Sequence, residues 1–259
     1  MHVHSTYSDG QFTLRELLEV FRAEGCAFVA ISDHAEYFDE RMLAQYHEEL
    51  ESLSNGEFFF VHGLEFSCEQ GMHILGYGAR ELVKTQEPQD VIARIQQQAA
   101  IAVIAHPKNE HLPWIENFDV LPDGIEVWNT KYDGKHAPRP ATFALMQRLR
   151  ARRPAMGAFY GQDLHWRQQS RVLFVEVESA ARDAQAVLTA LRAGAYIGRH
   201  GEMQLPSSGA LAAELLARFG EVQQASSRRW QWVKAVKKAM DRAGIPVPEA
   251  LKAPLRRFF

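Results

Sequence analysis

Two histidines near the start of the chain have the spacing of a metal-binding pair. His2 and His4 are two residues apart in a segment that we expect to be extended. Because side chains alternate along a strand, both imidazoles face the same side. The turn Ser8-Asp9-Gly10 adds a carboxylate just beyond this strand, and imidazole with carboxylate is a common ligand set for transition metals. Alternate histidines also occur on strands without any function, so the pair alone does not define a site.

Later apolar runs of the chain also lead to ligand-type residues. The predicted strands end in, contain or are followed by Asp33-His34, Glu65, His73, His106-Pro107 and Asp163-Leu164-His165. The active site of a parallel sheet lies at the carboxyl ends of its strands, so these side chains should converge with those of the first segment. Six imidazoles and three carboxylates at one edge would lose hydration and repel one another unless a cation compensated them. The nine candidate metal ligands are His2, His4, Asp9, His34, Glu65, His73, His106, Asp163 and His165.

The elements that must position these residues follow from hydrophobic periodicity. Strand-like apolar runs alternate with helical patterns, which is typical of βα units around a parallel sheet. We predict strands at residues 28–32, 58–66, 72–77, 101–105, 124–128, 158–161 and 173–177. We predict helices from a capping box at Thr13 to Gly25, and at 42–53, 88–99, 141–150 and 184–193. This order indicates an α/β fold, either a barrel or an open sheet.

Composition limits the class of protein. The chain has 259 residues, of which 46% are apolar and 24% charged, so it is neither disordered nor collagen-like. Its two cysteines, Cys26 and Cys68, are too few for a thiolate metal site or a disulfide framework and fit a reducing compartment. No apolar run reaches the roughly 18 residues of a membrane span, and no signal-peptide pattern is found at the first strand. We expect a cytoplasmic protein without a membrane partner.

Charge is unevenly distributed along the chain. From Glu221 onward, nine lysines and arginines stand against three acidic residues, a net charge of +6, which leaves −9 for residues 1–220 and −3 overall. Four apolar residues share one helical face in this tail: Trp230, Val233, Val236 and Met240. We therefore expect a main body at 1–220 and a basic helical extension at 221–259 that packs its apolar stripe on the body. The alternative is a basic helix that contacts RNA or an acidic partner.

Taken together, the motifs resemble those of a known family. The segments His2-x-His4-Ser5-x-x-Ser8-Asp9-Gly10, Asp33-His34, Glu65, His73, His106-Pro107 and Asp163-x-His165 look like the motifs of the polymerase and histidinol phosphatase (PHP) family of metal-dependent phosphoesterases. The resemblance extends from residue 2 to about residue 200. It implies that residues 1–220 form a distorted (β/α)7 barrel with two or three divalent metal ions, which would be Zn, Mn or Fe.

The resemblance also implies how the ligands are shared among the metal ions. One ion would be held by His2, His4, Glu65 and Asp163. A second ion would be bridged by Glu65 and held also by His73 and His106. A third ion would be held by Asp9, His34 and His165.

Three features depart from the family pattern. Gln162 stands where the family usually has serine before the last aspartate, and Ala35 stands where a polar or acidic residue is common. Both positions concern substrate contacts more than metal ligands. The metal-binding strand also begins one residue after Met1, so we expect a native start further upstream, or a neighbouring segment that holds this terminus.

A centre of this kind would hydrolyse phosphate esters. Metal ions about 3.5 to 4 Å apart lower the pKa of a bridging water toward about 7 and clamp both oxygens of an in-line displacement. Asp33 lies next to a ligand, which it would orient, or it would protonate the leaving group; the alternative is a strand-end cap. Lys108, after His106-Pro107, and Arg199, in a loop bounded by glycines, would hold phosphate oxygens or be surface charges.

The leading functional hypothesis is a metal-dependent phosphoesterase that acts on a small or short phosphorylated substrate through a metal-bridging hydroxide. The first alternative is an exonuclease on DNA or RNA ends or short oligonucleotides, because the basic tail with Trp230 and Trp232 would attract a nucleic-acid backbone and stack on bases. The second alternative is a catalytically inactive, metal-binding regulatory module. The sequence indicates no obligate protein partner.

Overall fold

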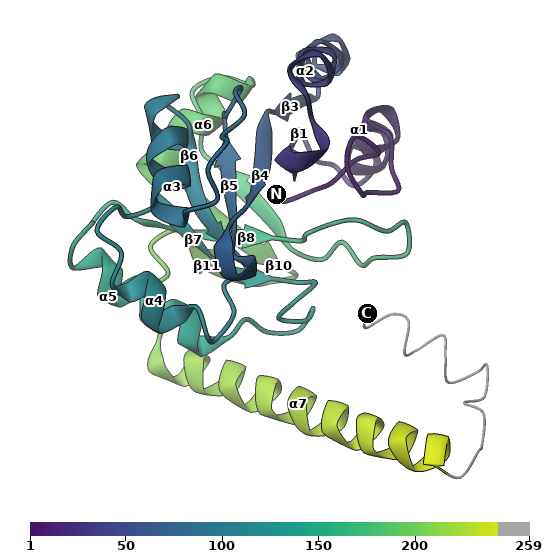
Figure 1. Ribbon diagram of the computed structural model, residues 1–259, viewed down its shortest axis with the longest axis vertical. Helices are drawn as coiled ribbons and strands as arrows, with labels where there is room; N and C mark the ends of the chain where they lie inside the picture. Colours follow the sequence, from purple (N-terminus) through teal and green to yellow (C-terminus); the bar gives the residue numbers. More distant parts are fainter. Residues whose placement is uncertain (243–259) are drawn as a thin grey trace.

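A mixed six-stranded sheet forms the centre of the molecule, with helices outside it (Figure 1). The computed structural model describes residues 1–242, with the backbone alone at 230, 234 and 237–242. The sheet order is β2-β4-β5-β6-β7-β8. Its strands are β2 (Asp33–His34), β4 (Gly63–Ser67), β5 (His73–Tyr77), β6 (Ile101–Ala105), β7 (Gly124–Asn129) and β8 (Gly157–Gly161). Neighbouring strands are parallel except that β5 runs antiparallel to both β4 and β6. The predicted α/β fold is confirmed, with a sheet that is mostly parallel.

Two strands predicted as continuous are interrupted. The run at 28–32 gives β1 (Phe28–Ala30), which ends before β2, and the run at 58–66 gives β3 (Phe59–Val61), which ends before β4. β1 pairs in parallel with β3 as a separate two-stranded sheet. The Ile31 amide still donates to the Val61 carbonyl at 3.1 Å. The backbone direction therefore continues through each interruption, and β2 and β4 emerge side by side.

Residues 1–4 connect the two edges of the six-stranded sheet. On one side, the His4 amide donates to the Leu164 carbonyl at 2.9 Å, just beyond β8. On the other side, the Ser32 amide donates to the Val3 carbonyl at 2.9 Å, just before β2. Val3 and Leu164 form an isolated parallel bridge. The six strands form an open sheet, so the expected (β/α)7 barrel is not confirmed. Residues 1–4 nevertheless link the two edges of this sheet.

The helices of the body follow the predicted periodicity except for α4, which was not predicted. They are α1 (Leu14–Ala23), α2 (Glu40–Leu53), α3 (Pro88–Gln97), α4 (Leu112–Glu116), α5 (Pro140–Arg150) and α6 (Ala184–Ala193), with short 3-10 turns η1 (Ala35–Tyr37) and η2 (Glu69–Gly71). The predicted capping box begins α1, because the Thr13 hydroxyl accepts from the Glu16 amide at 3.2 Å and the Glu16 carboxylate accepts from the Thr13 amide at 2.8 Å. None of the helices in the described part of the chain combines the length and hydropathy of a membrane span.

A second, antiparallel sheet contains one of the residues proposed to bind phosphate. Its strands are β9 (Phe174–Val177), β10 (Tyr196–His200) and β11 (Met203–Pro206), in the order β11-β10-β9. The expectation that Arg199 lies in a loop is wrong, because β10 continues through Arg199, which is in register with Phe174 on β9 and Gln204 on β11. The turn comes only afterwards, at Gly201, whose φ is 55°.

The C-terminal helix begins before the boundary expected at 220/221. Helix α7 (Ala213–Arg242) buries Phe219, and the side-chain Nε2 of Gln223 donates to the Asp133 carbonyl at 2.8 Å. Its later turns extend away from the sheet (Figure 1), and Trp232 is 68% exposed. In the predicted stripe, Val233 and Val236 are partly buried, whereas the side chains of Trp230 and Met240 lie outside the described residues. Packing of 221–259 on the body remains a prediction.

Candidate metal centre

All nine predicted ligands lie together at one edge of the central sheet. Most come from the carboxyl ends of parallel strands or the residues just after them, as expected. His73 reaches the same edge from the opposite direction, because it begins the antiparallel strand β5, in register with Ser67 at the end of β4 and Ala105 at the end of β6. Four overlapping groups have ligand atoms within 4.8 Å of one another: His4, Asp9, His34 and His165; His2, His106 and Asp163; His2, His4 and Glu65; Glu65, His73 and His106.

Glu65 lies at the centre of the cluster and is 1% exposed. Its Oε2 atom lies 3.2 Å from Nε2 of His2 and 3.2 Å from Nε2 of His4. Its Oε1 atom lies 3.0 Å from Nδ1 of His73 and 3.1 Å from Nε2 of His106. Each carboxylate oxygen thus faces its own pair of imidazoles, so Glu65 would be able to contribute one oxygen to each of two neighbouring cations.

Asp163 and its neighbour His165 form another side of the cluster. Asp163 Oδ1 lies 3.3 Å from His4 Nε2 and 3.1 Å from His165 Nδ1. The backbone is left-handed at His2 (φ 60°), His106 (φ 24°) and Asp163 (φ 49°), a conformation that costs non-glycine residues on the order of 1 kcal/mol or more. Three ligands therefore occupy strained positions, as is common where side chains must be aimed at a functional site.

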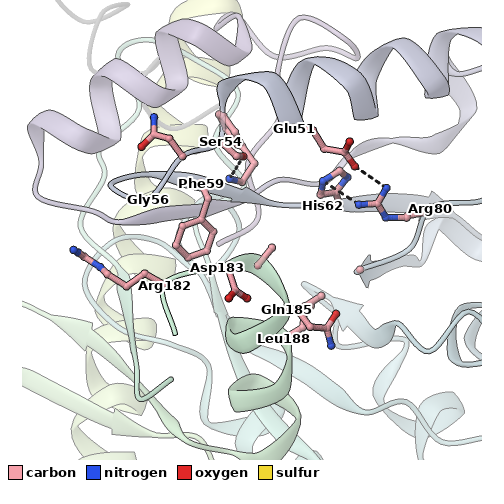
Figure 2. Close-up of a pocket in the computed structure, with 14 residues that line it drawn as sticks. Glu51, Ser54, Gly56, Phe59, His62, Arg80, Arg182, Asp183, Gln185 and Leu188 are labelled. Carbon is pink, nitrogen blue, oxygen red and sulfur yellow. Dashed lines mark hydrogen bonds and ion pairs between the residues drawn. The ribbon is translucent and has the colours of Figure 1, made fainter. Parts of the chain in front are cut away.

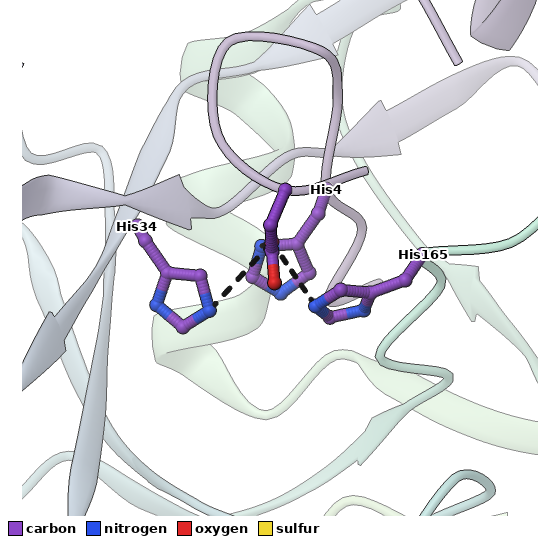
Figure 3. Close-up of side chains that lie close together, drawn as sticks. His4, His34 and His165 are labelled. Atoms are coloured by element: carbon purple, nitrogen blue, oxygen red, sulfur yellow. Dashed lines mark ion pairs between the residues drawn. The ribbon is translucent and has the colours of Figure 1, made fainter. Parts of the chain in front are cut away.

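The third group is the most open part of the centre. Figure 3 shows the rings of His4, His34 and His165 directed toward one another. Asp9 Oδ1 lies 3.2 Å from His165 Nε2, 3.8 Å from His4 Nδ1 and 3.9 Å from His34 Nε2. The Asp9 side chain is 40% exposed, whereas those of His4 and His165 are buried. Asp9 therefore marks the mouth of the cluster.

The donor set fits divalent cations. Four buried ring nitrogens make no well-aligned hydrogen bond among the described residues, although carboxylate oxygens lie 3.0 to 3.8 Å away: Nδ1 and Nε2 of His4, Nδ1 of His34 and Nδ1 of His73. Leaving such polar atoms unpaired is costly, and a bound cation would satisfy them. The set contains nitrogen and oxygen donors without thiolate, which suits Zn, Mn or Fe.

The pKa shifts of the ionisable groups in the cluster are those expected of a metal site that holds no metal. Burial alone would raise the pKa of Glu65 and of Asp163, but the positive potential of His2 and hydrogen bonds from the surrounding imidazoles lower it well below the usual range in both. Burial would lower the pKa of His2, but Glu126, Glu65 and Asp163 raise it well above normal. A proton on His2 thus helps to balance the carboxylates, and metal binding would displace it.

Glu126 is a functional candidate that the sequence analysis missed. It lies on β7 and is 1% exposed. Its carboxylate accepts hydrogen bonds from His2 Nδ1 at 2.9 Å, the His106 amide at 2.8 Å and Asn129 Nδ2 at 2.8 Å. A Cβ atom added to Gly161 would lie 1.6 Å from Glu126 Oε1, so only glycine leaves room for this carboxylate. The available signal was an ionisable residue within the apolar run Gly124–Asn129.

Asp33 is buried and faces the turn after the first metal-binding segment. Its Oδ1 atom accepts from the Ser5 amide at 2.7 Å and the Ser8 hydroxyl at 2.6 Å, and its Oδ2 atom accepts from the Ser5 hydroxyl at 2.8 Å. The geometry favours a positioning role for Asp33. Asp33 positions the turn that carries Asp9, however, and not the ring of His34 as expected.

The two cations expected to bind phosphate make other contacts. Lys108 Nζ lies 3.8 Å from Glu110 Oε1, and its side chain is 51% exposed. The Arg199 guanidinium pairs with Glu176 of β9, with Nη2 donating to Oε2 at 2.7 Å. A third cation, Lys131, which the sequence analysis did not single out, lies in the cluster with Nζ 3.2 Å from Asp163 Oδ1.

A separate cavity contains none of the nine ligands. It has a volume of about 540 Å³ and is lined by residues of α2, β3 and the start of α6, including Glu51, His62, Arg80 and Asp183 (Figure 2). Two contacts engage charged groups in it, because Arg80 Nη1 donates to Glu51 at 3.0 Å and the Asp183 carboxylate caps α6 by accepting from the Ala186 amide at 2.7 Å. The nine-residue cluster is therefore the candidate functional site.

Known proteins share this fold. No family model matches the chain. A stretch of 64 residues, 22% of the chain, is 38% identical to the DNA polymerase/3'-5' exonuclease PolX of Bacillus subtilis and spans 11% of that protein. A two-domain protein from Bacteroides vulgatus that contains a predicted PHP-like metal-dependent phosphoesterase has a similar structure, with a TM-score of 0.53 and 18% identity over 85% of this chain and 68% of that one. PsfC from Pseudomonas syringae has a TM-score of 0.52 and 14% identity over 87% of this chain and 96% of its own.

These comparisons define a class of fold. The chain has the fold found in PHP-like metal-dependent phosphoesterases, and the resemblance first seen in the motifs is confirmed at the level of fold. At these identities the structural likeness concerns the fold alone, so the activity must be argued from the site.

Proposed function

We propose that the protein is a metal-dependent phosphoesterase of the PHP type that hydrolyses a small or short phosphorylated substrate. The observation that carries the proposal is Glu65, whose two oxygens each face a pair of imidazoles within 3.2 Å. The buried nitrogens of His4, His34 and His73 that make no well-aligned hydrogen bond support it. We also propose that residues 1–4 act as the missing strand of a distorted seven-stranded barrel, because they hydrogen-bond to both sheet edges.

Each part of the cluster has its own task in this proposal. The predicted ligand assignment places Glu65 between two ions and Asp9, His34 and His165 around a third. Divalent cations held there would activate water and stabilise charge on the phosphoryl oxygens. Glu126 fixes the orientation and tautomer of His2 through its 2.9 Å hydrogen bond. Asp33 holds the turn that carries Asp9 at the mouth, where a substrate would enter.

The test is reconstitution. Protein stripped of metal with a chelator and reloaded with Mn or Zn should hydrolyse p-nitrophenyl phosphate, and Glu65→Gln should lose at least a hundredfold in kcat/KM, because one oxygen then becomes a poorly coordinating amide. His136→Gln, at an exposed position, is the matched control and should retain activity. Absence of turnover on monoesters, diesters and short oligonucleotides with every metal tried would refute the proposal.

A second candidate function is an exonuclease. It is supported by the 38% identity to the B. subtilis polymerase/exonuclease over 64 residues and by the basic tail. An end-labelled oligonucleotide distinguishes the two candidates. Stepwise shortening with kcat/KM well above that for p-nitrophenyl phosphate favours the exonuclease, whereas the reverse preference favours the small-substrate enzyme. A regulatory module without catalysis would retain metal binding but turn over neither substrate.

A further inference from the structure

The ammonium group of Lys131 lies inside the metal cluster. Lys131 follows β7 in the loop that leads to α5, and its side chain is 20% exposed. Its Nζ atom lies 3.2 Å from Asp163 Oδ1, and 3.3 and 3.4 Å from the two ring nitrogens of His165. Because Nζ is almost equidistant from both ring nitrogens, it is aligned with neither of them, and Asp163 is its main partner.

The ammonium group of Lys131 and a bound metal ion would both use the same carboxylate oxygen. The oxygen that Lys131 contacts, Asp163 Oδ1, is the same one that faces His4 Nε2 at 3.3 Å and His165 Nδ1 at 3.1 Å. A fixed positive charge on this oxygen compensates Asp163 when no metal is bound. The same charge opposes a divalent cation that uses the oxygen, because like charges at such distances interact strongly where water is excluded.

Two aromatic rings flank the ammonium group of Lys131 where it lies beside Asp163. Nζ lies 5.3 Å from the ring centroid of Tyr132 and 5.3 Å from that of Trp166, within range of favourable cation–π contact. Tyr132 is 54% exposed, so the position between these rings opens to solvent. A lysine has a long, flexible stem, and its nitrogen can leave Asp163 while remaining between the two rings.

We propose that Lys131 is a substrate-binding residue that neutralises Asp163 in the metal-free protein and contacts the substrate phosphate once metal ions are bound. The proposal rests on the phosphoesterase function proposed above. It assigns to Lys131 the task expected of Lys108 and Arg199, whose described partners are Glu110 and Glu176. A compact ammonium is a good ligand for a phosphate oxygen. Lys131 therefore lowers metal affinity and raises affinity for the anionic substrate.

The variant Lys131→Met should change metal affinity and phosphate affinity in opposite directions. Methionine keeps the unbranched shape and removes the charge. We expect Zn and Mn to bind the variant roughly fivefold to tenfold more tightly in calorimetric titrations, and inorganic phosphate to bind its metal-loaded form roughly tenfold more weakly. Lys131→Arg should restore much of the phosphate affinity. Lys135→Met, at an exposed position of the same loop, is the matched control and should change neither affinity.

The two proposals fail in different ways. Unchanged or weaker metal binding by Lys131→Met, or unchanged phosphate binding, overturns the role of Lys131 whether or not the protein is catalytic. Metal binding that becomes tighter together with weaker phosphate binding supports that role even before a substrate is known. Absence of turnover by the metal-loaded native protein on every phosphoester overturns the phosphoesterase function alone.

Discussion

At the scale of single residues, the cluster separates side chains that face the metal positions from those that support them. Glu126 belongs to the second kind, because its carboxylate accepts from His2, from the His106 backbone and from Asn129. A carboxylate behind a ligating histidine fixes its ring orientation and raises its basicity. Loss of Glu126 should therefore weaken metal binding without removing any ligand.

Glu126→Gln tests this at the site itself. The amide keeps the shape of the side chain but lacks the charge that supports His2, so metal affinity should fall by roughly 10- to 100-fold, as measured by competition with a chromogenic chelator. Gly161→Ala should have an effect of the same sign, because the added Cβ would displace the carboxylate. Glu178→Gln, an exposed control, should bind metal normally; unchanged affinity in Glu126→Gln would contradict the supporting role.

The convergence of the nine candidate ligands could be predicted from the sequence because their type and place both carry information. Histidines and carboxylates at strand ends share one edge whatever the details of packing, and all nine lie there. Lys131 and Glu126 could not be predicted in the same way. Lys131 lies in a loop whose path depends on tertiary contacts, and Glu126 lies within a strand whose partner, Gly161, is distant in sequence.

At the scale of elements, the main surprise is the antiparallel strand β5. Hydrophobic runs predict where strands lie but not their direction, because alternation looks the same from either end. A parallel β5 would have placed His73, its first residue, at the opposite edge from Glu65. The observed turn at η2 (Glu69–Gly71) between β4 and β5 instead brings His73 to the cluster through a short hairpin connection.

The interruption between β3 and β4 contains a second element-scale feature, His62. Its Nδ1 lies 2.9 Å from Nδ1 of His47 on α2. Its Nε2 lies 3.4 Å from Arg80 Nη2, and Figure 2 shows these two side chains together. Burial, followed by the positive charge of Arg80 and the neighbouring His47, lowers the pKa of His62 to about 4. The junction of these strands is therefore built around a neutral imidazole.

This junction should make the protein sensitive to acid. Between about pH 6.5 and pH 4 the unfolded chain binds a proton at residue 62 that the folded chain does not, so the free energy of unfolding should fall as pH falls through this range, by on the order of 2 kcal/mol. His62→Gln should lose much of this dependence in urea titrations of chelator-treated protein. His136→Gln, whose position is exposed, should keep it; identical pH profiles for His62→Gln and the native protein would contradict the prediction.

At the scale of the whole molecule, charge is divided between an acidic body and a basic tail. The helix that carries the start of this tail is anchored to the body by Phe219 and Gln223, while residues 224–229 beyond the anchor are exposed. The division of charge could be read from the sequence. The place where the helix leaves the body could not, because α7 crosses the expected boundary without a break.

Truncation tests whether the tail serves nucleic acid. Removal of residues 225–259 keeps both anchors. If the exonuclease alternative holds, this variant should lose salt-sensitive oligonucleotide binding by tenfold or more, because phosphate contacts release counterions, while turnover of p-nitrophenyl phosphate stays within about twofold. Binding is measured by fluorescence anisotropy between 50 and 200 mM salt. Equal oligonucleotide binding by the full and shortened chains would show that the tail does not bind nucleic acid.

The segment that joins the two sheet edges also carries two of the ligands. Three backbone hydrogen bonds join residues 1–4 to the chain after β8, whereas a single one, from the Ser32 amide to the Val3 carbonyl, joins them to the chain before β2. The rings of His2 and His4 point into the cluster. Bound metal ions would therefore also stabilise the connection between the two edges of the sheet. Hydrogen exchange at the His4 and Ser32 amides should slow by an order of magnitude or more when metal is added. Metal binding would then be a late step of folding as well as a requirement of catalysis.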